Sequence, residues 1–180
     1  MGRQTIQISD KTFELFRSAD ELHATVSRLA QELNRDYAGE KVVFVVVLKG
    51  AYLFAADLLR QLNIDCVVAF IKVSSYAGAE SSGTVKEQLS VTDDISNRNV
   101  VVIEDIVETG LTVGFLLNSL EKHHPKTLRL CTLLHKPHRF KGNFKIDYLG
   151  ENISDEFVVG YGLDYDEIGR NFPELYQMKL

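Results

Sequence analysis

The chain has 180 residues, of which 45% are apolar and 25% are charged, and its formal net charge at pH 7 is −5. This length suffices for one domain with a full hydrophobic core, so we expect a single domain over residues 1–180. The negative charge argues against a general nucleic-acid surface, which needs clustered Lys and Arg. The sequence has no run of about eighteen apolar residues and no hydrophobic signal core, which predicts a cytoplasmic protein that does not bind membranes.

Cysteine and histidine give no sign of a metal centre. Cys66 and Cys131 both lie in apolar, β-branched runs, where a thiol behaves as a small buried hydrophobe. No Cys-x-x-Cys pair or Cys/His metal spacing occurs, so neither a disulfide scaffold nor such a metal site is expected. The histidines, including His135 and His138 in a loop, are expected at surface or helix-end positions rather than in catalysis.

The first half of the chain alternates helix and strand patterns. A capping box at 18–21 opens a run of apolar residues at helical spacing, and this helix should end before Gly39. The continuous apolar run 42–48 is typical of a strand buried on both faces of a parallel sheet. Residues 51–62 are predicted to form the crossover helix, and 66–73 the next strand.

The alternation continues with a strand at 100–104, a helix at 112–122 and a strand at 127–134. This order predicts an α/β fold, with a central, mostly parallel twisted sheet flanked by helices and right-handed crossovers. After Leu134 the polarity rises. Short strand-like pieces near Tyr148 and at 157–159 suggest a smaller subdomain beside the sheet.

Residues 74–98 show no convincing periodicity, and Gly and Ser gather in the first part of this segment. Loops of this length in compact domains are usually lids or disordered segments. Because this one should face the carboxyl ends of the strands, a lid is the favoured interpretation.

The stretch 100–112, Val-Val-Val-Ile-Glu-Asp-Ile-Val-Glu-Thr-Gly-Leu-Thr, is the most informative in the chain. A strand-to-helix turn directs free N–H groups and the positive end of a helix at one point, which suits a phosphate. Glu104 and Asp105 would repel that phosphate, but they suit sugar hydroxyls or a divalent cation. A ribose phosphate with magnesium would satisfy both features. The alternative is an ordinary turn in which the threonines cap the helix.

In doubly wound sheets ligands collect outside the carboxyl ends of the strands. Lys49-Gly50, the 74–90 loop, residues 104–112 and the segment after Leu134 should therefore converge on one site.

The acid pair followed by a threonine-rich turn resembles the motif with which type I phosphoribosyltransferases bind 5-phosphoribosyl-1-pyrophosphate (PRPP). Further matches to hypoxanthine-guanine phosphoribosyltransferases follow in order along nearly the whole chain: Val-Leu-Lys-Gly-Ala-Tyr at 47–52, Ser75-Tyr76, Leu-Leu-His-Lys at 133–136, and Phe-Val-Val-Gly-Tyr-Gly-Leu-Asp-Tyr at 157–165, followed by Arg170.

This resemblance implies a type I phosphoribosyltransferase fold. Its core would span about 38–135, with a lid loop at about 74–98 and a hood built from the N-terminal residues and about 136–180. It also implies a magnesium-dependent purine-salvage transferase. Such an enzyme joins hypoxanthine or guanine to PRPP, giving IMP or GMP and pyrophosphate.

The resemblance assigns roles to individual residues. The 5′-phosphate would lie on Glu108, Thr109, Gly110, Leu111 and Thr112. The ribose hydroxyls and Mg²⁺ would contact Glu104 and Asp105. Asp164 would provide a second Mg²⁺ contact. Pyrophosphate would bind Lys49, Gly50 and Arg170, next to a Leu48–Lys49 peptide that is often cis. The purine would contact Lys136, Phe157, Val158 and Asp164, and Ser75 and Tyr76 would belong to the lid.

Lys136 and Phe157 would decide which base is accepted. By resemblance, Phe157 stacks on the purine and Lys136 donates to the oxygen at C6. A lysine is donor-only, so an adenine amino group would face it donor against donor, and the site should prefer 6-oxopurines. The choice among hypoxanthine, guanine and xanthine stays open, because it depends on carbonyl directions near Leu163 and Asp164.

Glu108 departs from the family, in which Asp is usual and acts as general base or hydrogen-bond partner at purine N7. Glutamate keeps the carboxylate but moves its oxygens by about 1.5 Å. We assign the catalytic role to Glu108.

Two other functions stay open. A PRPP-binding regulatory protein would need a basic surface or an added nucleic-acid-binding segment, and neither is visible in the sequence. A phosphoribosyltransferase for another base, such as xanthine or a pyrimidine, would keep the same phosphate site. The resemblance further implies a homodimer or homotetramer.

Overall fold

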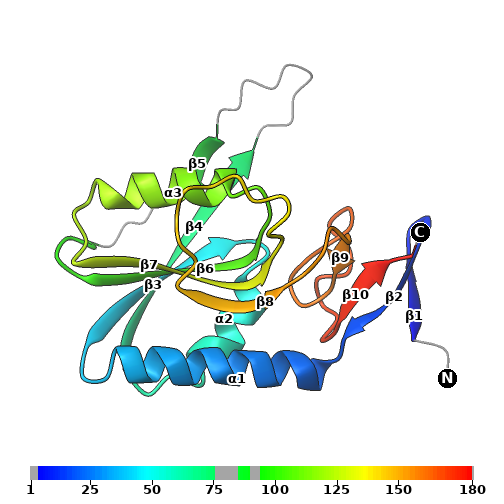
Figure 1. The fold of residues 1–180 in the computed structure, drawn as a ribbon, viewed down its shortest axis with the longest axis horizontal. Coiled ribbons are helices and arrows are strands. Elements are labelled where there is room, and N and C mark those ends of the chain that lie inside the picture. Colours follow the sequence, from blue (N-terminus) through cyan, green and yellow to red (C-terminus); the bar gives the residue numbers. More distant parts are fainter. Residues whose placement is uncertain (1–3, 76–84, 90–93, 180) are drawn as a thin grey trace.

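The structure is a computed structural model that describes residues 4–75, 85–89 and 94–179. It consists of a six-stranded sheet with helices on both faces and a four-stranded sheet at one end (Figure 1). Within the described residues, no helix is both long enough and apolar enough to cross a membrane.

The main sheet has the strand order β5-β4-β3-β6-β7-β8. All neighbours pair in parallel except β5, which is antiparallel to β4. The sheet is therefore mostly parallel, as predicted. Its strands are β3 (Lys41–Leu48), β4 (Asp65–Ser75), β5 (Val85–Leu89), β6 (Asn99–Val107), β7 (Thr127–His135) and β8 (Tyr148–Asn152).

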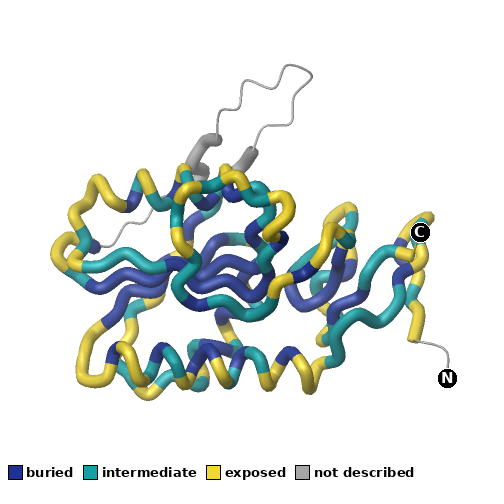
Figure 2. Tube along the Cα trace, in the orientation of Figure 1, coloured by how far each residue is buried: buried dark blue, intermediate teal, exposed yellow. Residues whose placement is uncertain are grey.

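Three helices cover the sheet: α1 (Ala19–Asp36) and α2 (Tyr52–Leu59) on one face and α3 (Leu111–Glu121) on the other (Figure 1). The side chains of β3 alternate between these layers. Phe44 and Val46 pack with α1 and α2, whereas Val45 and Val47 pack with α3. Both faces of β3 are thus buried (Figure 2), which explains why its sequence is apolar without interruption.

The predicted capping box starts α1. The Ser18 hydroxyl accepts a hydrogen bond from the Glu21 N–H at 3.3 Å, and the Glu21 carboxylate accepts one from the Ser18 N–H at 2.8 Å. Two of the free N–H groups at the helix end are satisfied in this way.

The second sheet joins the two ends of the chain. Its order is β1-β2-β10-β9, and all of its pairs are antiparallel. Ile8, Phe13, Val159 and Tyr176 form a small core of their own between these strands. We call this unit the hood; its strands are β1 (Thr5–Ile8), β2 (Lys11–Arg17), β9 (Val158–Val159) and β10 (Leu175–Met178).

Some sequence predictions were wrong. The strand at Tyr148 is not part of the smaller subdomain: β8 is the sixth strand of the main sheet and pairs in parallel with β7. The segment 74–98, predicted as a loop, contains β5, which pairs with β4. The sequence patterns did not predict the hairpin β1–β2 or strand β10. His135, expected in a loop, is the last residue of β7.

The two cysteines differ in environment. Cys131 is buried, as predicted, but Cys66 is exposed. Alternate residues of β4 face opposite sides of the sheet, and Ala69 and Ile71 point into the layer under α3. Cys66, Val68 and Phe70 share the other side, and all three are exposed there.

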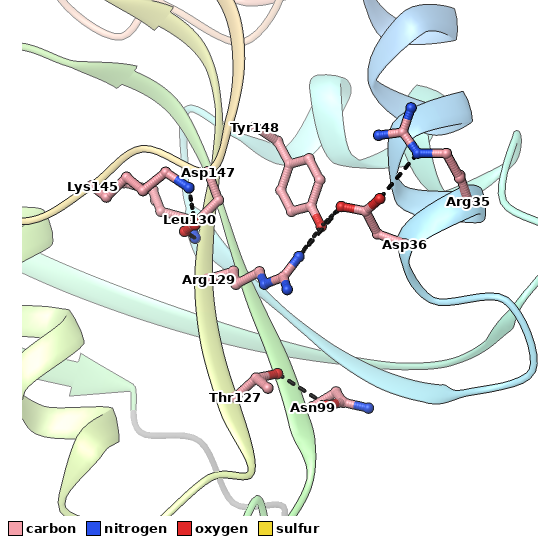
Figure 3. Close-up of polar contacts among 9 residues, drawn as sticks. All are labelled: Arg35, Asp36, Asn99, Thr127, Arg129, Leu130, Lys145, Asp147 and Tyr148. Atoms are coloured by element: carbon pink, nitrogen blue, oxygen red, sulfur yellow. Dashed lines mark hydrogen bonds and ion pairs between the residues drawn. The ribbon is translucent and has the colours of Figure 1, made fainter.

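A polar cluster ties α1 to β7 and β8 near the amino ends of these strands (Figure 3). The buried Tyr148 hydroxyl donates to Asp36 at 3.0 Å and accepts from Arg129 at 2.7 Å. Burial raises the pKa of Tyr148, so its hydroxyl remains protonated and able to donate. The cluster lies at the opposite end of β7 from Lys136, which follows its last residue.

Candidate active site

A cavity of about 330 Å³ opens at the carboxyl ends of β3 and β6. The end of β6 and the turn into α3 supply most of its lining, and the end of β3 with Gly50 supplies the rest. Its polar lining comes from Glu104, Asp105, Glu108, Thr109 and Thr112, together with the backbone at Gly50 and Gly110. The structure therefore brings most of the residues expected to hold a ribose phosphate around one space.

The turn into α3 leaves its first N–H groups without a side-chain cap. Gly110 is the N-cap residue, with a φ of +80°, and no side chain caps the helix there. The Thr109 hydroxyl accepts only a long hydrogen bond, 3.4 Å, from the Leu111 N–H. The helix end can therefore offer its remaining amide donors and its positive dipole to an anion.

The segment after Lys136 supports this turn from outside. A Cβ atom at Gly110 would lie 2.7 Å from the Phe140 ring, so only glycine fits there. The Lys141 N–H also donates to the Thr109 carbonyl at 3.0 Å. The turn is thus held by a second part of the chain and is not shaped by its own sequence alone.

Glu104 and Asp105 are buried, with 7% and 8% of their surfaces exposed. The Ile106 N–H donates to the Asp105 carboxylate at 2.8 Å, and the Asp105 N–H to Glu104 at 3.2 Å. Burial, followed by the charge of Asp105, holds the pKa of Glu104 well above its usual value. Burial also raises the pKa of Asp105. Two adjacent buried acids are costly unless a cation or hydroxyl donors reach them.

Gly50 lies directly against this acid pair. A Cβ atom at Gly50 would come within 1.6 Å of an Asp105 carboxylate oxygen. On its other side, a Cβ at Gly162 would lie 2.0 Å from the Gly50 carbonyl. The loop after β3 is therefore held between β6 and the hood, and the Leu48–Lys49 peptide that leads into it is cis.

Glu108 forms an ion pair with Lys136, whose Nζ lies 2.5 Å from a Glu108 carboxylate oxygen. Lys136 is buried, with 3% of its surface exposed, and follows β7. Arg139 lies 3.6 Å from the other Glu108 oxygen and also pairs with Asp155 at 3.2 Å. The expected base and the expected purine-binding lysine are thus neighbours.

A second charged cluster joins the loop after β3 to the hood. Lys49 pairs with Glu167 at 2.8 Å, and Arg170 pairs with Asp164 at 2.6 Å and with Glu167 at 3.3 Å. The Lys49 ammonium, followed by the Arg170 guanidinium, lowers the pKa of Glu167. Arg170 also donates to the Gly162 carbonyl at 2.8 Å. Three residues expected near pyrophosphate, Lys49, Asp164 and Arg170, therefore meet here.

Phe157 directly precedes β9, and Val158 is the first residue of that strand. Val158 is buried and pairs with Gln177, whereas Phe157 keeps 44% of its surface exposed. The Phe157 ring meets Tyr165 edge to face at 5.9 Å. One flank of the ring is thus supported, and the exposed remainder could receive a flat ligand.

Some expected residues lie elsewhere. Leu111 is 69% exposed and does not line the cavity. Ser75 is the last residue of β4, and Tyr76, the other lid residue, is outside the described residues.

Sequence reasoning missed Glu167 and Arg139, which pair with the predicted site residues Lys49 and Glu108, and Asp155, which pairs with Arg139. The spacing Asp164-x-x-Glu167-x-x-Arg170 was a visible signal for the first of these. Nothing in the sequence indicated the other two.

The fold and the cavity define an α/β protein that presents uncapped amides beside buried carboxylates at its strand ends. Comparisons with known proteins agree with this class. A sequence profile described as a phosphoribosyl transferase domain matches residues 18–166. The chain therefore belongs to the phosphoribosyltransferase family, as the sequence motifs predicted.

Individual relatives cover nearly the whole chain. It is 39% identical over 175 residues to a hypoxanthine-guanine phosphoribosyltransferase of Aquifex aeolicus (strain VF5), which covers 96% of this chain and 98% of that protein. A solved hypoxanthine-guanine phosphoribosyltransferase from Bacillus anthracis superposes with a TM-score of 0.86 at 40% identity, covering 93% and 97% of the two chains. The hypoxanthine phosphoribosyltransferase of Trypanosoma cruzi, solved in complex with the product IMP, superposes with a TM-score of 0.87 at 32% identity. The match covers 98% of this chain and 97% of that chain.

Proposed function

We propose that this chain is a purine-salvage enzyme that joins hypoxanthine or guanine to PRPP and releases pyrophosphate. The observation that carries the proposal is the cavity in which the uncapped turn of α3 lies beside the buried acids Glu104 and Asp105. A phosphate ester requires hydrogen-bond donors, and the hydroxyls of a sugar diol require acceptors. This cavity offers donors for the first and acceptors for the second. The names of the relatives support the same activity.

The 5′-phosphate would bind the amides at Thr109–Thr112, with the two threonine hydroxyls as further donors. The ribose hydroxyls would donate to Glu104 and Asp105. Lys49 and Arg170 would hold the pyrophosphate, for which the planar guanidinium offers bidentate recognition. These contacts fix both ends of PRPP while its C1′ faces the base.

Magnesium fits the acid pair only with the help of the substrate. Within the described residues, no group of three or more His, Cys, Asp and Glu side chains could hold a metal ion. Mg²⁺ commonly binds one or two carboxylates together with substrate phosphates and water, which suits Glu104 and Asp105, and Asp164 nearer the pyrophosphate. When bound, it would neutralise charge on the departing pyrophosphate.

Glu108 accepts the proton in this mechanism. As purine N9 forms its bond to C1′, the bond from C1′ to the pyrophosphate oxygen breaks, and the base loses its N7 proton to the Glu108 carboxylate. Lys136 has three donors, so it can keep its ion pair with Glu108 and still donate to the oxygen at C6. Phe157 would stack on the ring, and the Val158 backbone would meet the base edge.

A panel of bases tests this function. The chain, PRPP and Mg²⁺ are incubated with hypoxanthine, guanine, xanthine, adenine and a pyrimidine, and nucleotide formation is followed. We expect IMP and GMP and only trace products from adenine and the pyrimidine. Absence of nucleotide from every base, together with retained PRPP binding, would instead favour a regulatory protein.

We further propose a homodimer or homotetramer. Cys66, Val68 and Phe70 lie exposed on one side of β4, where neither α1 nor α2 covers them. Contiguous apolar surface of this kind is typical of protein contacts. Sedimentation or light scattering should give a mass of two or four chains; a monomer at micromolar concentration would contradict this. The cytoplasmic location expected from the sequence stays a prediction.

A further inference from the structure

One carboxylate of this chain bridges the two cations that the proposed function assigns to pyrophosphate. Oε2 of Glu167 lies 2.8 Å from the Lys49 ammonium and 3.3 Å from the Arg170 guanidinium. Lys49 follows β3 in the main sheet, whereas Arg170 belongs to the loop between β9 and β10 in the hood. The two cations are thus held together by an acid that the expected binding roles do not include.

The local backbone keeps Glu167 in this place. Its φ is +66°, in the left-handed region that few residues other than glycine adopt. Its N–H donates to the Asp164 carboxylate at 2.7 Å, and Arg170 is anchored by Asp164 and by the Gly162 carbonyl. The turn that carries Glu167 is therefore tied to the same residues that orient Arg170.

A carboxylate and a phosphate group compete for the same donors. Both are anionic and accept hydrogen bonds through oxygen, so Lys49 and Arg170 cannot give all of their donors to both at once. Glu167 and Lys49 are mostly exposed, with side chains 66% and 53% accessible. Ion pairs at such exposure are weak, so an incoming pyrophosphate group can displace them.

We propose that Glu167 occupies the pyrophosphate position of the unliganded site and is displaced when PRPP or pyrophosphate binds. This inference rests on the proposed function. Glu167 lowers the affinity of the site for both ligands, and it gives Lys49 and Arg170 an anionic partner again when pyrophosphate leaves. Glu167 is therefore a residue that sets ligand affinity without handling the reacting atoms.

The alternative is that Glu167 helps pyrophosphate to bind. If Glu167 instead oriented Lys49 and Arg170 for the ligand, its removal would weaken pyrophosphate binding. The two roles predict changes of opposite sign.

The test compares Glu167→Gln with Asp166→Asn in the full chain. Asp166 is the preceding residue, is exposed and also has a positive φ, but the described contacts join it to neither cation. Each variant removes one negative charge from the same turn, and each keeps a side chain of similar shape. Calorimetry with pyrophosphate and Mg²⁺ gives the dissociation constant directly, and the unfolding temperature of each variant checks its fold.

We expect Glu167→Gln to bind pyrophosphate roughly two- to tenfold more tightly than the unsubstituted chain, as loss of two weak pairs allows. Asp166→Asn should stay within about twofold. The KM for PRPP should fall with Glu167→Gln, while that for hypoxanthine stays constant.

Unchanged or weaker pyrophosphate binding by Glu167→Gln would overturn the inference. So would an equal gain in pyrophosphate affinity in Asp166→Asn. Failure of all the proteins to bind pyrophosphate would overturn it too. These results leave the proposed function to be judged separately, by nucleotide formation in the base panel. Conversely, tighter binding by Glu167→Gln without any nucleotide formation would support the inference and contradict the proposed chemistry.

Discussion

At the scale of single residues, the ion pair between Glu108 and Lys136 connects proton transfer with base recognition. One carboxylate oxygen of Glu108 meets the buried Lys136 ammonium, while Arg139 approaches the other oxygen. The pair is therefore both a candidate base and a fixed point for the purine. Substitutions at its two members should have different kinetic effects.

Glu108→Gln should lower turnover by about 10²- to 10⁴-fold, the usual contribution of a general base, because the amide cannot accept the N7 proton. PRPP affinity should change little, since the amides of the α3 turn remain. Steady-state kinetics with hypoxanthine and a separate PRPP binding measurement check this, with Glu108→Asp as the variant that keeps a carboxylate. Near-normal turnover of Glu108→Gln would remove Glu108 from the mechanism.

Lys136→Gln should weaken the preference for 6-oxopurines. The glutamine amide can donate or accept, so an adenine amino group no longer faces only donors. We expect kcat/KM for hypoxanthine to fall by about tenfold or more, as loss of a charged hydrogen bond implies, and the ratio of hypoxanthine to adenine rates to narrow. An unchanged ratio would show that other groups select the base.

At the scale of secondary structure, elements with a strong local signal could be predicted. Strand β3 is apolar throughout because both of its faces are buried, and α1 carries its own capping box. The strand β5, Val-Lys-Glu-Gln-Leu, has no such signal and exists by pairing with β4. For the same reason the position of β8 was mispredicted, since its five residues do not indicate which sheet they join.

The candidate site divides in the same way. The turn at 104–112 is continuous in sequence, so its cavity could be anticipated. Arg139 could not be, because it meets Glu108 only through the folding of distant segments. The spacing from Asp164 to Arg170 did indicate Glu167, but not its ion pair with the distant Lys49.

The cluster of Figure 3 allows a prediction about the packing of elements. Tyr148→Phe removes a hydroxyl that bonds both Asp36 and Arg129, and it leaves these partly buried charges short of one partner. The free energy of unfolding should fall by about 1 to 2 kcal/mol. Transferase activity should persist, since the cluster is at the other end of β7 from Lys136.

Denaturant titration measures the effect. Lys145→Gln is a suitable control beside the cluster, because Lys145 is 81% exposed and its ion pair with Asp147 does not involve Tyr148, Asp36 or Arg129. It should change stability by less than about 0.5 kcal/mol. A loss as large as that of Tyr148→Phe would show that the cluster acts through general charge and not through the tyrosine bonds.

At the scale of the whole molecule, the hood and the main sheet are joined at the site itself. Gly162 of the hood packs against Gly50, and Arg170 and Lys49 share Glu167. Ligand binding at the strand ends should therefore also stabilise the hood, which is built from both ends of the chain (Figure 1).

The most direct test of the proposed function is a crystal structure of the chain with IMP. We predict that the phosphate lies on the amides of Thr109–Thr112, the ribose hydroxyls on Glu104 and Asp105, and the base between Phe157 and Lys136. A nucleotide bound elsewhere, with this cavity empty or filled by side chains, would contradict the account.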